Sequence, residues 1–387
     1  MTAALRGQAA VVGVAESDLG EVGPGRYPLD LAAQAAAAAL AEAGLSTRDV
    51  DGLFSVVAGR MMPTLDVGEY LGIRPRYTDS TMIGGSAFVS HLHHAALALA
   101  VGACDVALIV YGSTPRADNG RARLGAAAPE LPSYERAFAP RSPVSGYALA
   151  AARHMHEFGT TTEQLAEVAV AARQWARLNP RAFARDPLTA ADVMASRVIS
   201  SPLRALDCCL VTDGGGAVVV TRADRARDLP QPPVYVLGAG EAHDHKIISQ
   251  MPDLTTTAAV DSAGRAFAMA GITPADVDVV ELYDAFTINT VLFLEDMGFC
   301  AKGEGGPFVS GGRIGPGGGL PVNTNGGGLS YCHPGMYGIF TIIEAVRQIR
   351  GECGRRQQPD VNVAVAHGNG GQLSSQVTAV LGSAATL

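Results

Sequence analysis

Short apolar runs alternate along the chain with longer segments of helical periodicity. The run 8–14 (QAAVVGV) precedes an alanine-rich helical segment, 29–43, which ends at Gly44, a residue typical of helix C-termini. The run 105–111 (DVALIVY) is apolar almost throughout, as expected for a strand buried on both faces. Because strand and helix patterns alternate in this way, we expect an α/β fold with a largely parallel sheet and helices on its faces.

The same pattern occurs twice. Residues 41–51 (AEAGLSTRDVD) are similar to 268–278 (AMAGITPADVD), and 105–110 (DVALIV) are similar to 360–365 (DVNVAV). One such match would only indicate two similar helix ends in an alanine-rich chain, but a glycine turn leading into a helix also lies between the matches in each half. This order predicts two copies of one α/β unit packed on each other. The predicted boundaries are 1–114 with 203–228 for the first unit, 115–202 for an insertion, and 229–387 for the second unit.

The insertion carries a series of arginines spaced by four. They are Arg173, Arg177, Arg181 and Arg185. For any one of them, a solvated helix face or loop is the favoured interpretation. The alternative is a guanidinium surface that binds phosphates.

Composition narrows the possible functions. With 387 residues, 48% hydrophobic and 17% charged, the chain is too apolar to be disordered. A net charge of −8 argues against a nucleic-acid partner, because phosphate contacts need a surplus of Lys and Arg. The six cysteines form no C-x-x-C pair, which argues against structural zinc and fits a reducing compartment. The start shows no export signal and the longest apolar stretch, 31–41, is too short for a bilayer, so we expect a cytoplasmic protein without a membrane span.

Polar side chains follow predicted strands in three segments of the second half. These are 281–286 (ELYDAF), 323–335 (NTNGGGLSYCHPG) and 367–371 (HGNGG). A single buried Tyr or His more often only satisfies a hydrogen bond. Because ligands bind at the carboxyl ends of parallel strands, three such segments together indicate a site. No dinucleotide or P-loop glycine motif accompanies them, so we expect neither a cofactor nor a metal.

These motifs resemble those of the thiolase superfamily, specifically its sterol-carrier-protein-type branch, over essentially the whole chain. The matching segments are, in order, 82–86 (MIGGS), 213–220 (DGGGAVVV), 280–286 (VELYDAF), 325–334 (NGGGLSYCHP) and 367–371 (HGNGG). The resemblance implies a duplicated thiolase fold in a five-layer αβαβα arrangement with an inserted loop domain. It also implies a homodimer and an acyl-CoA substrate.

The departures from the thiolase pattern concern the catalytic thiols. Met82 stands where a thiolase has its nucleophilic cysteine, and a thioether cannot form an acyl-enzyme. The His-Asp-Cys-Phe motif of the sterol-carrier-type branch has become Tyr283-Asp-Ala285-Phe, while His367 is retained. Claisen condensation by the usual route is therefore excluded. Cys332, in place of a usual glycine, leaves open an acyltransferase that uses a displaced thiol.

The groups that remain can stabilise an enolate. In relatives, His333 belongs to the oxyanion hole, and Asn325 with the nearby glycine amides could polarise the thioester carbonyl. Two phenols have been added, Tyr283 and Tyr331, which suit a retro-aldol reaction on a β-hydroxyacyl-CoA. One Tyr would accept the hydroxyl proton, with its pKa tuned by His333 or His367. The predicted catalytic residues are Tyr283, Tyr331, His333 and His367, and the predicted substrate-binding residues are Met82, Asn325, Gly327 and Cys332.

This combination resembles the thiolase-like steroid side-chain aldolases of sterol degradation. That resemblance implies cleavage of a 17-hydroxy steroid with a propionyl-CoA side chain into a 17-ketosteroid and propionyl-CoA. It also implies a small partner protein of the OB-fold, zinc-ribbon type, bound to the dimer in a heterotetramer. A non-catalytic carrier of acyl-CoA or lipid is a further alternative, because a thiolase fold without its nucleophile could bind without turnover.

Overall fold

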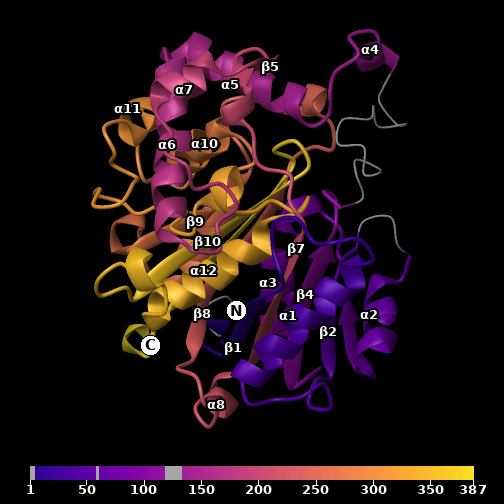
Figure 1. Ribbon diagram of the computed structural model, residues 1–387. Coiled ribbons are helices and arrows are strands. Elements are labelled where there is room, and N and C mark those ends of the chain that lie inside the picture. Colours follow the sequence, from indigo (N-terminus) through magenta and orange to yellow (C-terminus); the bar gives the residue numbers. More distant parts are fainter. Residues whose placement is uncertain (1–4, 58–60, 118–132) are drawn as a thin grey trace.

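The computed structural model describes residues 5–57, 61–117 and 133–387, and a nine-stranded sheet lies at its centre (Figure 1). The strands of this sheet are β1 (Ala9–Glu16), β2 (Gly52–Ser55), β3 (Tyr77–Asp79), β4 (Val106–Ser113), β7 (Gly214–Arg222), β8 (Val234–His243), β9 (Val279–Leu282), β10 (Val363–Gly370) and β11 (Ser375–Gly382). Their spatial order is β3-β2-β4-β7-β1-β8-β11-β10-β9. A two-stranded sheet, β5 (Val198–Ser200) with β6 (Leu203–Arg204), lies in the insertion.

The sheet contains the duplication that the sequence predicted. In the first unit β2 and β4 are parallel, and β7 pairs antiparallel with both β4 and β1. In the second unit β9 and β10 are parallel, and β11 pairs antiparallel with both β10 and β8. The two units join where β1 pairs with β8. Two copies of one α/β unit are thus confirmed.

The expectation of a largely parallel sheet is wrong. Among the described strands of the large sheet, five of the eight pairings are antiparallel. A short turn connects β10 to β11, and a short connection of this kind permits only antiparallel pairing. Parallel pairing is confined to strands that are connected through a helix or a long crossover.

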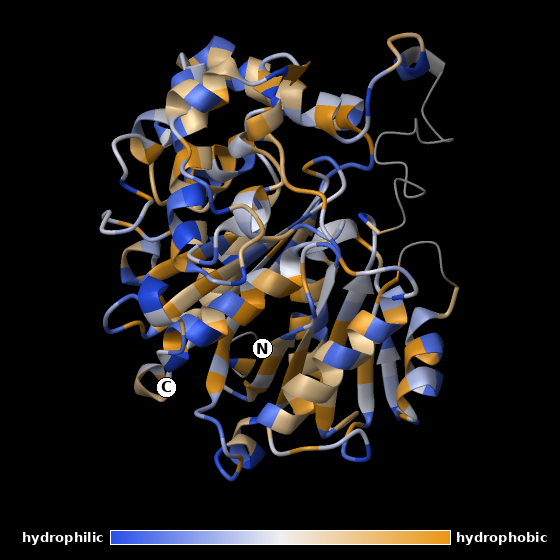
Figure 2. Cartoon of the chain, in the orientation of Figure 1, coloured by the Kyte–Doolittle hydropathy of each residue, from blue (hydrophilic) through white to orange (hydrophobic). Residues whose placement is uncertain are grey.

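The helices form layers on and between the two halves of the sheet. They are α1 (Pro28–Glu42), α2 (Pro63–Leu71), α3 (Ala87–Ala100), α4 (Ser133–Arg136), α5 (Val144–Phe158), α6 (Thr162–Leu178), α7 (Ala190–Ala195), α8 (Ala223–Ala226), α9 (Ala259–Ala270), α10 (Thr287–Asp296), α11 (Gly305–Val309) and α12 (Gly338–Arg350). α1 packs on the first unit and α9 on the second, while α3 and α12 pack on each other and on strands of both units. This is the predicted five-layer αβαβα arrangement, and Figure 2 shows hydrophobic residues concentrated where strands and helices meet.

Equivalent glycines let the outer helices lie close to the sheet. A Cβ atom on Gly13 of β1 would lie 2.2 Å from the carbonyl oxygen of Ala39 in α1. A Cβ atom on Gly238 of β8 would lie 2.1 Å from the carbonyl oxygen of Ala266 in α9. Neither strand could carry a side chain here without displacing its helix. The same close approach in both units is independent support for the duplication.

The insertion lies at one end of the molecule, where α6 contacts α10, α11 and the turn that contains Gly327 (Figure 1). Part of it, residues 118–132, falls outside the described residues, and the domain boundaries stay a prediction. Within the described ranges, no helix is both long and apolar enough to cross a bilayer. In the same part of the chain, no cluster of three or more His, Cys, Asp or Glu side chains could hold a metal ion.

Candidate active site

The two units meet at the turn before α3, where Met82 stands in place of a thiolase's nucleophilic cysteine. Met82 is 55% exposed, and Gly84–Ser86 form one helical turn that leads into α3. A Cβ atom on Gly85 would lie 2.0 Å from the ring of Tyr283. Only glycine at this position allows the Tyr283 ring to pack on the turn. The place of a thiolase nucleophile is therefore next to a phenol from the second unit.

Tyr283 and His333 form a hydrogen-bonded pair. Tyr283 directly follows β9, and its Oη lies 3.0 Å from Nε2 of His333 and 3.4 Å from the carbonyl oxygen of Gly335. The backbone N–H of His333 donates to Oγ1 of Thr212 at 2.9 Å, which holds the segment that carries the imidazole. The pair is nearly enclosed, because Tyr283 is 5% and His333 8% exposed. Both residues were predicted as catalytic, but the sequence left open which Tyr and which His would be partners, and Thr212 was missed.

Burial determines the charge state of this pair. It raises the pKa of Tyr283 well above its ordinary value of 10 and lowers the pKa of His333 to about 4. At pH 7 the pair therefore consists of a neutral phenol and a neutral imidazole. Such a pair can relay a proton, with the phenol taking one from a ligand as it passes its own to the imidazole.

Tyr337, which sequence reasoning missed, supports both His333 and Asn325. Its ring stacks on His333 with centroids 6.4 Å apart and meets Tyr283 edge-on at 5.8 Å. Its Oη donates to Oδ1 of Asn325 at 2.8 Å, and the N–H of Gly327 donates to the same oxygen at 2.8 Å. With Oδ1 occupied, Nδ2 of Asn325 is held as a donor that no described residue engages. The segment 333–337 (HPGMY), directly before a predicted helix, was the available signal.

The glycine amides are not free to polarise a carbonyl, which corrects the expectation from the sequence. The N–H of Gly327 donates to Asn325, and the N–H of Gly328 donates to Oδ1 of Asp284 at 2.5 Å. These two glycines begin a five-residue π-helical turn, Gly327–Tyr331, of a kind frequent at functional sites. Their amides orient the Asn325 and Asp284 side chains instead of contacting a ligand.

Asp284 is a buried carboxyl group beside the pair, and sequence reasoning did not single it out. Its Oδ2 has no hydrogen-bond partner among the described residues. Burial outweighs the hydrogen bond from Gly328 and raises the pKa of Asp284 to about 7. A Cβ atom on Gly328 would lie 3.2 Å from Oδ1 of Asp284 and 3.1 Å from Cδ2 of His333, so the carboxyl group and the imidazole both lie next to this glycine.

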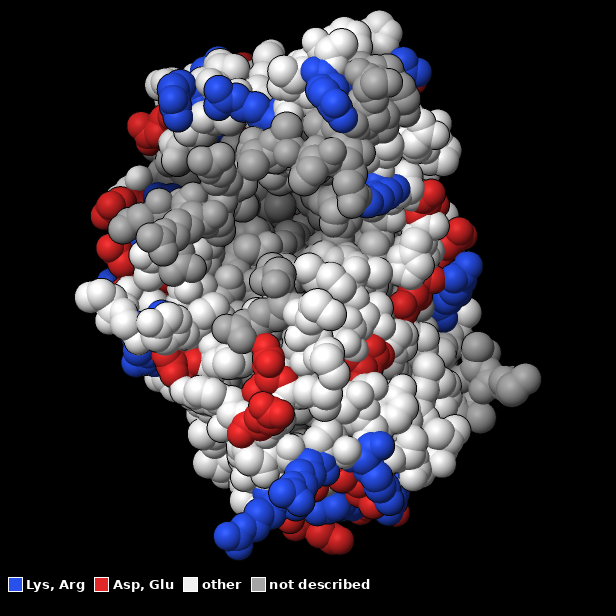
Figure 3. Space-filling view, turned by 90° about the vertical axis from the view of Figure 1, so that its right-hand side faces the viewer, with Lys and Arg blue, Asp and Glu red and all other residues white. Residues whose placement is uncertain are grey.

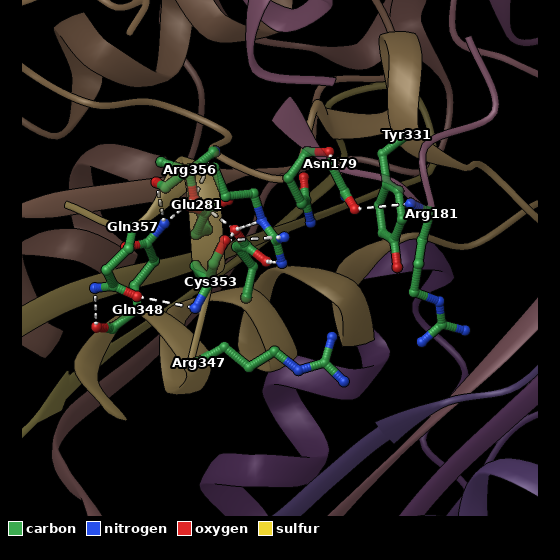
Figure 4. A network of polar contacts seen from close by, with 12 residues as sticks. Asn179, Arg181, Glu281, Tyr331, Arg347, Gln348, Cys353, Arg356 and Gln357 are labelled. Carbon is green, nitrogen blue, oxygen red and sulfur yellow. Dashed lines mark hydrogen bonds and ion pairs between the residues drawn. The ribbon is translucent and has the colours of Figure 1, made fainter. Parts of the chain in front are cut away.

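Tyr331 is held in a different network. Its Oη donates to Oε1 of Glu16 at 2.8 Å, and Glu16 also accepts from Arg347 on both oxygens at 2.6 Å and from Arg181 at 2.9 Å. Figure 4 shows the Tyr331 hydroxyl on the side where the guanidinium groups of Arg181 and Arg347 lie. Among the described residues, no hydrogen bond or close ring contact joins Tyr331 to Tyr283 or His333. The structure therefore does not bring the two predicted phenols together.

His367 also lies apart from the pair. Its ring nitrogens are 2.9 Å from Oγ1 of Thr378 and 2.9 Å from Oε1 of Gln376, and its ring meets Phe293 of α10 at 4.6 Å. The side chain is fully buried, and burial lowers its pKa to about 4. Both nitrogens are satisfied on the α10 side of the sheet, and among the described residues no hydrogen bond joins the His367 ring to Tyr283 or Tyr331.

Of the two thiols nearest the cluster, Cys332 is buried and Cys209 is half-buried. Cys332 is fully inaccessible, and burial together with the charge of Glu16 raises its pKa well above the ordinary value of 9. Cys209, whose backbone N–H donates to the carbonyl oxygen of Ala285, has a pKa raised by burial in the same way. Both are therefore thiols and not thiolates at neutral pH, which is unfavourable for nucleophilic attack.

The chain is similar to known proteins of one family. Residues 240–383 match the family described as thiolase C-terminal domain-like. The chain is 39% identical to the 17-hydroxy-3-oxo-4-pregnene-20-carboxyl-CoA lyase of Mycobacterium tuberculosis, over 90% of this chain and 92% of the lyase. It is 35% identical to an acetyl-CoA acetyltransferase of Methanothermobacter thermautotrophicus, over 94% of this chain and 96% of that enzyme.

A solved structure shows the same fold at similar identity. The Ltp2-ChsH2(DUF35) aldolase superposes with a TM-score of 0.88 at 33% identity and covers 98% of both chains. Relatives matched over nine-tenths or more of their length thus include a lyase, an aldolase and an acetyltransferase. The chain belongs to the thiolase superfamily, among the sterol-carrier-protein-type, thiolase-like steroid side-chain aldolases.

Proposed function

We propose that the protein cleaves a β-hydroxyacyl-CoA by a retro-aldol reaction. The proposed substrate is a 17-hydroxy steroid with a propionyl-CoA side chain, and the products are a 17-ketosteroid and propionyl-CoA. The observation that carries the proposal is the Tyr283–His333 pair, packed on the turn where Met82 replaces a nucleophile. It offers proton transfer where a thiolase would offer a thiol. The names of the lyase and aldolase relatives support the substrate class.

The proposed reaction begins with proton transfer from the substrate hydroxyl. Tyr283 takes this proton while passing its own to Nε2 of His333, and the C–O bond becomes the ketone C=O. The bond to the α-carbon breaks, and its electron pair forms the thioester enolate. Nδ2 of Asn325 and the newly charged imidazolium of His333 stabilise the enolate oxygen. The proton then returns through Tyr283 to the α-carbon, which gives propionyl-CoA.

The direct test is product formation. The full-length protein, with its partner, is incubated with a 17-hydroxy steroid acyl-CoA and, separately, with a β-hydroxyacyl-CoA that lacks the ring system. We expect propionyl-CoA from the steroid substrate. Turnover of the simple thioester alone would contradict the steroid assignment but not the reaction. Binding without turnover of either would favour the non-catalytic carrier.

We also propose the assembly that the resemblance implied, two copies of this chain with two copies of a small OB-fold, zinc-ribbon-type partner. The solved Ltp2-ChsH2(DUF35) aldolase has a DUF35 protein in its name, which supports a partner of this kind. Among the described residues on the face in Figure 3, Lys and Arg lie at the upper and lower ends and along the right-hand side and form no continuous basic surface. Co-expression followed by light scattering on the purified complex tests the stoichiometry.

Asp284 should control the pH profile of the reaction. Below its pKa of about 7 the group is neutral. Above that pKa it is a carboxylate next to Gly328, which His333 also neighbours, and this negative charge makes the imidazole a stronger base. We therefore expect kcat/KM to rise with pH through about 7. Asp284→Asn should flatten this rise and lower kcat/KM at pH 8 by about tenfold, the scale of a nearby buried charge. Asp276→Asn, at an exposed carboxylate of the same unit, should keep the wild-type profile; an unchanged profile in Asp284→Asn would contradict the assignment.

The acyltransferase alternative predicts an essential thiol, and we expect none. Because Cys332 is inaccessible and protonated, iodoacetamide should leave it unmodified in the native protein and modify it in urea. Cys332→Ala should keep cleavage activity within about threefold, since no step uses the sulfur. Peptide mass spectrometry locates the modified cysteines. Loss of activity in Cys332→Ala with an intact fold would favour the acyltransferase.

A further inference from the structure

A cavity of about 370 Å³ lies at the end of α12 that is remote from the active site. Its charged lining comes from two parts of the chain: Arg177 and Arg185 from the insertion, and Glu352, Arg355 and Arg356 from the segment after α12. The Tyr283–His333 pair lies at the other end of this helix, where Gly338 packs on Gly85. Because α12 has 13 residues, its two ends are about 20 Å apart.

Three of the four arginines in this cavity have no partner among the described residues. Arg356 is occupied, since its Nε and Nη2 donate to the two oxygens of buried Glu344 at 2.7 and 2.9 Å. Arg177, Arg185 and Arg355 are exposed, and none of them makes a hydrogen bond or ion pair with a described residue. With Glu352 opposing these three charges, the lining carries a net charge of about +2, a value that a phosphate dianion would neutralise.

The arginine series of the insertion separates into two pairs with different environments. Arg173 donates to Oγ of Ser330 at 2.9 Å, and Arg181 forms an ion pair with Glu16 at 2.9 Å. These two arginines hold the insertion to the rest of the fold. Arg177 and Arg185 have no such role and face the cavity. An anion bound in this concave site would meet two guanidinium groups that no described residue engages.

Hydrogen bonds to α12 hold one wall of the cavity. Cys353 and Arg356 both contact Glu344, and Gln348 donates to the carbonyl oxygen of Arg356 at 3.1 Å (Figure 4). The cavity volume falls within the range of about 300–1,000 Å³ typical of small-molecule sites. We propose that this cavity binds a phosphorylated small molecule, a phosphomonoester or a diphosphate, through Arg177, Arg185 and Arg355. The site goes beyond the proposed cleavage reaction and does not depend on it.

Inorganic pyrophosphate serves as the probe. Calorimetric titration of the full-length protein at low ionic strength should show saturable binding at one site per chain. The double variant Arg177→Gln/Arg185→Gln should weaken this binding at least about tenfold, because each change removes a charge-assisted hydrogen bond to the anion. Arg48→Gln, at an exposed arginine of the first unit without a described partner, should bind as the wild type does. All the substituted side chains are exposed, so matching thermal unfolding curves confirm that the variants fold.

Three results would contradict phosphate binding in this cavity. Absence of saturable binding, or equal weakening in the double variant and in Arg48→Gln, would overturn the proposal. Retention of wild-type affinity in the double variant would also overturn it. A competition titration with CoA then identifies the source of the phosphate: displacement of pyrophosphate assigns the site to the phosphate end of CoA, and its absence assigns a separate phosphorylated ligand. No turnover is measured, so failure of the cleavage assay leaves this test unaffected.

Discussion

Replacing Tyr283 with Phe should lower kcat for retro-aldol cleavage by about 10²–10⁴-fold, the usual contribution of a positioned acid–base group. The change removes only the hydroxyl that lies 3.0 Å from Nε2 of His333. The ring would keep its packing on Gly85 and its edge contact with Tyr337. We therefore expect KM and the thermal unfolding curve to change little. Release of propionyl-CoA under saturating substrate measures the effect.

Tyr235→Phe is the matched control. Tyr235 is equally buried, on β8, and lies outside the candidate site, so its loss of one hydroxyl should leave kcat within about twofold. An unchanged kcat in Tyr283→Phe would contradict the proposed proton relay. Tyr331→Phe then becomes the decisive variant for the second predicted phenol. If Tyr331 only supports the fold through its hydrogen bond to Glu16, Tyr331→Phe should lower the free energy of unfolding. The kcat of the folded fraction should then stay unchanged.

Replacing Glu16 with Gln should lower the free energy of unfolding by about 3 kcal/mol, the scale of a broken buried ion pair. Glu16 is buried and accepts hydrogen bonds from Tyr331, Arg347 and Arg181. Burial by itself would raise the pKa of this carboxyl, but the two guanidinium charges outweigh burial and lower it from 4.5 to about 2. The amide of Gln cannot neutralise them. Urea unfolding at pH 7 measures the difference.

The same carboxylate predicts the acid sensitivity of the fold. Because its pKa is lower in the folded state than in the unfolded state, the contribution of Glu16 is present above about pH 4.5 and is lost as the pH falls toward 2. The stability difference between the wild type and Glu16→Gln should therefore shrink over that range. Glu21→Gln, which removes an exposed ion pair with Arg116, should cost less than about 1 kcal/mol at any pH. A difference that does not change with pH would contradict the assignment.

The sequence by itself determined two features, the duplicated α/β unit and the absence of the thiolase nucleophile. Repeated segments and helical periodicity depend on residue type and spacing, so both were visible without coordinates. The loss of the nucleophile at Met82 was equally visible, because a thioether has no proton to lose and cannot become a thiolate. The motifs at the ends of strands indicated Tyr283 and Tyr331 as candidate acid–base groups and His333 and His367 as their candidate partners. The 3.0 Å contact in the structure joins Tyr283 and His333 from among these candidates.

For the other side chains of these motifs, only the tertiary structure decided the direction in which each one points. On β10, Gly368 faces α3 while its neighbour His367 faces α10, because successive residues of a strand lie on opposite faces of the sheet. A motif identifies such residues but not the face on which each one lies. Tyr331 is bound by Glu16, 315 positions away in the chain, and no local pattern contains a partner so distant. Long-range packing therefore determines which side chains of a motif form the site and which support the fold.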